Sequence, residues 1–199
     1  DHLDTLAAVQ ALAQLYEDQG KFAEAEQLLD DALERSLLLD GPEGRVTINI
    51  QAQLAGVYED LGRLEEAEEA HTAAVEAARE HLGPEDHDTL SMISDLAGLF
   101  NNTGRMDQAE PLTKQVLAIR TETLGPDHPE TMRCINNLAL VYQYQGKYDQ
   151  AEELYLDVVE AQTRVLGAEH QETLLARNNL VVLKVLQGFF DDAETICKE

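Results

Sequence analysis

The stretch Leu124–Val159, LGPDHPETMRCINNLALVYQYQGKYDQAEELYLDVV, contains one unit of a pattern that the whole chain repeats. The same landmarks return at a fixed spacing of 42 residues, as from Gly20 to Gly62. Three kinds of position share this spacing: Gly20, Gly62, Gly104, Gly146 and Gly188; Gly41, Gly83, Gly125 and Gly167; and Ala25, Ala67, Ala109, Ala151 and Ala193. Three series with one period indicate a tandem repeat, in which each copy packs mainly against its neighbours.

Each copy has the pattern of two helices joined by a tight turn. His128 stands where a helix N-cap is expected, Pro129 suits the first helical position, and Glu130 suits the positive end of the helix dipole. Apolar residues then recur three or four positions apart until Gly146, a residue that commonly ends helices. A second helix of the same kind follows and ends near Gly167. The cap positions of the other copies are His2, Gly44, Asp86 and His170.

The pattern predicts an all-α fold of about five tandem helix hairpins in one uninterrupted array, the last hairpin truncated. The expected repeats are residues 1–43, 44–85, 86–127, 128–169 and 170–199. Because the first residues already belong to a repeat, we expect the chain to be a piece of a longer protein.

At this level of detail the chain resembles a known family. The signature positions of the tetratricopeptide repeat are matched by Leu138, Ala139, Tyr142, Gly146, Tyr148, Ala151 and Tyr155. The segment LGPDHPET between copies resembles the repeats of kinesin light chain, and equally the arrays that trail signalling NTPases in fungi and bacteria. The resemblance implies a right-handed α-solenoid whose first helices line a concave groove, and a role in protein interaction. It does not imply a particular partner.

The resemblance also places a set of polar side chains on the expected groove. Amides and hydroxyls dominate it, and a carboxamide can pair with both the C=O and the N–H of an extended peptide. We therefore expect a peptide-binding groove, with solvated or loop-capping amides as the alternative. The candidate residues are Gln10, Gln14, Asn49, Gln53, Ser91, Ser94, Asp95, Arg133, Asn136, Asn137, Asn178 and Asn179.

The two ends of the expected groove differ in chemistry. Glu17, Asp18, Glu59 and Asp60 would make one end acidic and favour a neutral or basic partner, although acids are abundant throughout the chain. The other end is apolar, which indicates either a surface for the next repeat or a self-association surface. Its candidate residues are Val182, Val185, Leu186, Phe189 and Phe190.

Composition argues against several other functions. With 39 acidic and 14 basic residues, a formal net charge of −25 disfavours nucleic acid and anionic membrane as partners. The two cysteines, Cys134 and Cys197, have no metal-binding or disulfide spacing and occupy apolar positions, so we expect inert thiols in a reducing, cytoplasmic setting. His71 falls at an apolar position and is expected in the core. No motif indicates a catalytic residue, a cofactor or a metal site.

Three functions remain open from sequence. The first is a non-catalytic module that binds an extended peptide of a partner protein. The second is a regulatory or sensor array of a larger signalling NTPase or effector. The third is a structural unit that assembles through its ends.

Overall fold

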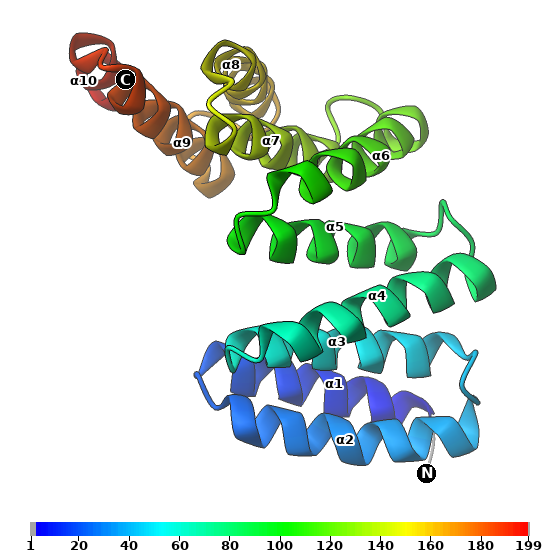
Figure 1. The fold of residues 1–199 in the computed structure, drawn as a ribbon. Helices are drawn as coiled ribbons and strands as arrows, with labels where there is room; N and C mark the ends of the chain where they lie inside the picture. The colour runs from blue at the N-terminus through cyan, green and yellow to red at the C-terminus, as the bar shows by residue number, and fades with distance from the viewer. Residues whose placement is uncertain (1–2, 199) are drawn as a thin grey trace. The chain divides into compact units, whose positions relative to one another are not determined.

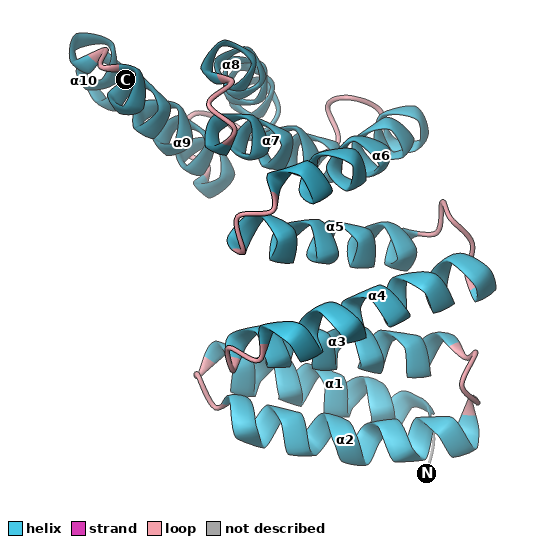
Figure 2. Ribbon diagram, in the orientation of Figure 1, coloured by secondary structure: helices cyan, strands magenta, loops and turns pink. Residues whose placement is uncertain are grey.

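A computed structural model describes residues 3–198 of the chain, and these residues form helices joined by loops, with no strand (Figures 1 and 2). His2 of the cap series lies outside the described residues. In chain order the repeats contribute α1 (Leu3–Asp18) and α2 (Phe22–Leu39), α3 (Arg45–Asp60) and α4 (Leu64–His81), α5 (His87–Asn102) and α6 (Met106–Leu124), α7 (Pro129–Tyr144) and α8 (Tyr148–Leu166), and α9 (Gln171–Gln187) and α10 (Phe190–Lys198). The predicted all-α repeat fold is confirmed.

The chain divides into two compact units, residues 1–99 and 100–199. In the first unit α1 packs against α2, α2 against α3, and α3 against α4, while α1 also contacts α3. In the second unit the same order of contacts runs from α6 to α10, and α7 contacts α9. Each unit therefore places successive first helices beside one another. The prediction of one uninterrupted array stays a prediction.

Small residues sit where the two helices of a hairpin meet. Ala13 and Ala25 are fully buried in one core cluster of the first unit. Ala139 and Ala151 are fully buried in the equivalent cluster of the second unit, around the buried ring of Tyr155. The alanine series of the sequence thus marks fully buried positions of the core, where a larger side chain would overpack it.

The turn inside each hairpin combines a left-handed glycine with a cation over an aromatic ring. Gly146 has φ +74°, and the N–H of the residue after it donates to the carbonyl of Tyr142, as expected for a helix C-terminus. The charged nitrogen or guanidinium carbon lies close to the ring centroid in every hairpin, a contact worth about 0.5–1 kcal/mol at exposed sites. The pairs are Lys21 and Tyr16 (5.6 Å), Arg63 and Tyr58 (4.4 Å), Arg105 and Phe100 (4.5 Å), Lys147 and Tyr142 (5.1 Å), and Lys184 and Phe189 (5.3 Å).

The last pair is reversed in sequence. In the first four hairpins the aromatic residue precedes the cation by five positions, but Lys184 precedes Phe189. The contact is kept because either order places both side chains across the same glycine turn. This series was available in the sequence, at the same 42-residue spacing, and the sequence reasoning missed it.

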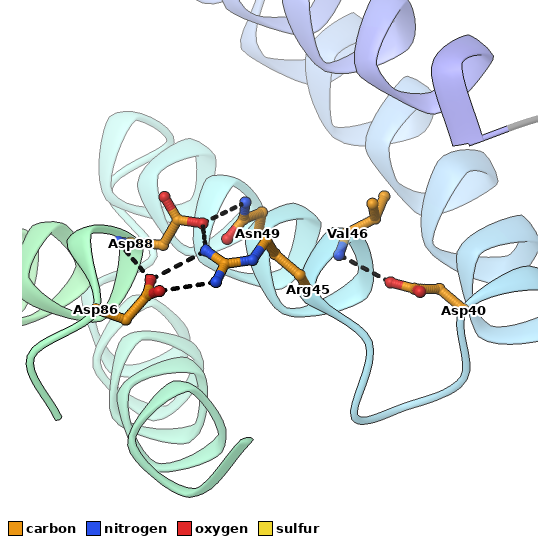
Figure 3. A network of polar contacts seen from close by, with 6 residues as sticks. All are labelled: Asp40, Arg45, Val46, Asn49, Asp86 and Asp88. Atoms are coloured by element: carbon orange, nitrogen blue, oxygen red, sulfur yellow. Dashed lines mark hydrogen bonds and ion pairs between the residues drawn. The ribbon is translucent and has the colours of Figure 1, made fainter. Parts of the chain in front are cut away.

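The helix caps follow the predicted positions with one exception. The side chains of His128 and His170 accept hydrogen bonds through Nδ1 from the N–H groups two residues on, at 3.2 and 3.3 Å. Asp86 accepts in the same way at 3.0 Å. Gly44 has no side chain, and the equivalent N–H of Val46 donates instead to Asp40 Oδ2 at 2.9 Å (Figure 3). The unusual loop before α3 therefore supplies the missing cap from four residues upstream.

Candidate interaction surfaces

In the first unit, the predicted groove amides connect neighbouring first helices. The Gln53 amide of α3 donates to the backbone carbonyl of Gln10 at 3.1 Å and to Glu17 Oε1 at 3.0 Å, both on α1. Gln10, Asn49 and Gln53 are only half-exposed. The Gln53 side chain therefore links α3 to α1, a role that is neither solvation nor loop capping.

Asn49 belongs to a charged network around Arg45 (Figure 3). The Arg45 guanidinium donates to both carboxylate oxygens of Asp86, at 3.0 and 2.7 Å, and to Asp88 Oδ2 at 2.5 Å. Asn49 Nδ2 donates to the same Asp88 oxygen at 3.2 Å. The Arg45 guanidinium lowers the pKa of Asp86 below its usual range. Arg45 thus ties the start of α3 to the loop and first turn of α5, through residues that all lie in the first unit.

In the second unit, the four predicted asparagines separate into two pairs with different roles. Asn179 Nδ2 of α9 donates to Asn136 Oδ1 of α7 at 3.0 Å, and both side chains are half-buried. Asn137 and Asn178 are exposed, as is Arg133 on the same helix as Asn137. Arg133 forms an ion pair with Glu130 one turn earlier. The inner pair therefore joins the two first helices, and the outer pair is accessible to a partner.

The remaining groove candidates differ in how far they are exposed. Gln14 and Asp95 are exposed, whereas Ser91 and Ser94 are half-exposed. Ser94 Oγ donates to the carbonyl of Leu90 within its own helix at 2.9 Å. Ser94 is therefore already engaged by its own backbone.

The acidic residues at the ends of α1 and α3 lie close enough to affect one another. Burial raises the pKa of Glu17, and the charges of Asp60 and Asp18 raise it further, against the Gln53 hydrogen bond that lowers it. Burial and the neighbouring Glu59 raise the pKa of Asp60. Neighbouring carboxylates repel one another, which raises their pKa values. The same concentration of negative charge would attract a cation placed here. The acids predicted to form this end are brought together in the first unit.

The apolar residues predicted at the C-terminal end are exposed. Val182, Val185, Leu186, Phe189 and Phe190 have exposed fractions of 42, 47, 53, 53 and 66%. Phe189 also makes the turn contact with Lys184 described above, so it has a structural role that the sequence reasoning did not assign.

Some of the buried polar side chains were predicted from the sequence and others were not. His71 is 3% exposed, as predicted; burial lowers its pKa, and its Nε2 lies 3.9 Å from Glu59. Arg120 is 5% exposed and Gln162 is 3% exposed, and neither was singled out from sequence. Cys134 is buried, whereas Cys197 is exposed, although the equivalent positions of the earlier repeats, Leu29, His71, Thr113 and Tyr155, are buried. Cys197 lies in the last turn of α10.

Among the described residues, no group of three or more His, Cys, Asp or Glu side chains is arranged to hold a metal ion. None of the described helices combines the length and the apolar character required to span a membrane.

Comparison with protein families gives one match that covers most of the chain. A model of the tetratricopeptide repeat matches residues 4–80, 88–162 and 134–199. None of the curated proteins compared matches the chain significantly.

Solved structures with the same fold include kinesin-light-chain-like proteins. The nearly identical repeats of a protein described as a kinesin light chain from Podosopora anserina superpose with a TM-score of 0.83 at 27% identity, covering 100% of this chain and 94% of that one. A glutamine-to-methionine variant of those repeats gives 0.85 at 27% identity, covering 100% and 93%. BtubC from P. vanneervenii gives 0.82 at 22% identity, covering 94% and 75%, and supports the fold alone.

Proposed function

Because the chain belongs to the tetratricopeptide repeat family, whose arrays are generally protein-interaction modules, we propose that it binds an extended segment of a partner protein along its first helices without catalysing a reaction. The observation that carries the proposal is the pairing of α7 and α9 in the second unit. The Asn179–Asn136 hydrogen bond joins the two helices, and their neighbours in sequence, Asn178 and Asn137, are exposed. Each exposed amide offers a donor and an acceptor to a peptide main chain.

The acidic residues of the first unit support a preference for neutral or basic partners. Glu17, Asp18 and Asp60 repel one another, so a basic side chain bound nearby would relieve that repulsion. Attraction of this kind weakens with salt. A basic peptide that binds should lose affinity as ionic strength rises, and affinity independent of salt would contradict this electrostatic part.

The test uses the outer asparagines, because replacing Asn136 or Asn179 would also break the link between helices. Asn137→Ala with Asn178→Ala should weaken binding to an array of blocked neutral and basic peptides by about tenfold or more. The matched control is Gln108→Ala with Gln150→Ala, two exposed amides at equivalent positions of α6 and α8. Equal loss in both double variants, or no loss in either, would contradict the proposed surface.

Assembly through the C-terminal end is a second candidate, supported by the exposed apolar side chains there. Phe190 is 66% exposed, and Val185 and Leu186, a few residues earlier in the chain, have exposed fractions of 47 and 53%. Sedimentation at increasing protein concentration tests this candidate. Association that Val185→Ser with Phe190→Ser abolishes would support it, and a strictly monomeric chain would rule it out.

A further inference from the structure

A pocket of about 300 Å³ opens in the second unit where the starts of α7 and α9 meet the end of α8. It lies at the loop edge of the repeats, whereas the amide pair Asn136 and Asn179 lies along the middle of the first helices. The side chains that line it are those of Pro129, Arg133, Gln162, Leu166, His170 and Glu172.

Gln162 is the unusual member of this lining. Its side chain is 3% exposed, yet its Oε1 is buried and accepts no hydrogen bond within residues 3–198. A buried carbonyl without a donor costs free energy, and it becomes favourable when a donor is supplied. Gln162 thus lines the pocket and carries a buried acceptor that has no donor.

The preceding copy shows which group suits this position. Arg120 occupies the place 42 residues before Gln162, is 5% exposed, and donates to Cys134 Sγ at 3.3 Å. Its Nη2 lies 3.0 Å from Glu130 Oε2. In the earlier copy the Arg120 guanidinium thus occupies this position and pairs with the Glu130 carboxylate, in the first turn of the next helix.

The later copy keeps the carboxylate but lacks the guanidinium. Glu172 stands 42 residues after Glu130, also in the first turn of its helix, and no described cation forms an ion pair with it. Ala176 replaces Cys134, which leaves more room. The shorter Gln162 replaces Arg120 and contributes an acceptor where the earlier copy has a donor.

We propose that this pocket binds a guanidinium group, held by the Glu172 carboxylate and by Gln162 Oε1. A planar guanidinium can donate to two acceptors from different helices at once, which an ammonium does less well. An anion is disfavoured because it would face Glu172. Arg133 also lines the wall, but it shares the Glu130 carboxylate with Arg120 and its side chain is 56% exposed, so solvent screens its charge. The group could come from an arginine of a partner peptide or from a small guanidinium compound.

Guanidinium binding at this pocket is separate from peptide binding along the first helices, and a small probe tests it without any partner protein. N-acetyl-arginine amide is titrated into the ¹⁵N-labelled chain, with the lysine and citrulline counterparts as comparisons. We expect saturable shifts of the Gln162 side-chain amide and of α9's first turn. Citrulline, which has the same shape without the charge, should bind at least about tenfold more weakly.

Two variants and a control complete the test. Gln162→Arg places the side chain of the earlier copy into the pocket and should abolish binding. Glu172→Gln should weaken it by about tenfold or more, and provides the same readout if the first variant folds poorly. Glu169→Gln removes an exposed acid outside the lining and should leave binding unchanged.

The outcomes separate the proposals. Unsaturable shifts, equal binding of citrulline, or unchanged binding to Gln162→Arg would overturn the pocket assignment. A blocked peptide with one arginine that binds more tightly than the amino acid amide indicates a partner chain as the source, and equal binding indicates a small molecule. The Asn137 and Asn178 substitutions should not affect the arginine probe, so failure of the peptide surface and failure of the pocket are distinguishable.

Discussion

The reversed turn pair of the last hairpin gives the sharpest test of how these repeats are held together. Lys184 lies over the ring of Phe189 at 5.3 Å, and its Nζ is 2.6 Å from Glu152 Oε1. In the preceding copy the cation is Lys147, which lies over Tyr142 and 3.1 Å from Glu110. If the turn depends on the contact and not on the order of the two residues, exchanging them should be tolerated.

The size of the effect follows from the two interactions that Lys184 makes. The cation–π contact contributes about 0.5–1 kcal/mol at an exposed site. The ion pair with Glu152 adds about 0–1 kcal/mol, towards the upper end because the Lys184 side chain is only 12% exposed. We therefore expect Lys184→Met to cost about 1–2 kcal/mol and Phe189→Ala to cost about 1 kcal/mol. Lys184→Tyr with Phe189→Lys restores the order of the other copies and should cost less than either single change.

Native-state hydrogen exchange of α9 and α10 is the appropriate assay, because an end repeat opens locally before the whole chain unfolds. A loss of about 1.4 kcal/mol corresponds to about tenfold faster exchange. The single variants should exchange several-fold faster than the wild type, and the exchanged pair should recover most of the protection. If the exchanged pair is no better protected than the single variants, the reasoning that the contact matters and its order does not is refuted.

Two further predictions concern the caps and the ion pairs. Asp40→Ala should lower the free energy of unfolding by about 1 kcal/mol in urea denaturation, since the Val46 N–H loses its acceptor; Asp40→Asn should lose little, and an unchanged midpoint for Asp40→Ala would contradict the capping role. The Glu110 carboxylate accepts from Lys114, Gln145 and Lys147, which lower its pKa from 4.5 to about 2. A lowered carboxyl pKa gives stability that is fully present above the unfolded-state value and is lost as the pH falls. The unfolding free energy should therefore drop more steeply from about pH 4.5 to pH 2 in the wild type than in Glu110→Gln, and parallel curves would contradict it.

The sequence determined the elements of this protein and the equivalence of their positions. The glycine turns, the helix caps and the helical spacing of apolar residues each depend on contacts within a few residues of the chain. The 42-residue spacing of the glycine and alanine series shows which positions of the repeats are equivalent. Local backbone preferences and one buried face are enough to specify such features. The helices therefore begin and end where the pattern places them.

The tertiary structure alone decided what the polar side chains do. The sequence put Asn136, Asn137, Asn178 and Asn179 in one class, but packing joins the inner two and exposes the outer two. The sequence likewise could not show that the Arg120 guanidinium occupies a position that the shorter Gln162 side chain leaves unfilled one repeat later. The physical reason is that a hydrogen bond requires atoms within about 3 Å, and residues on different helices, such as Asn136 and Asn179 or Arg120 and Cys134, reach that distance only through the packing of those helices.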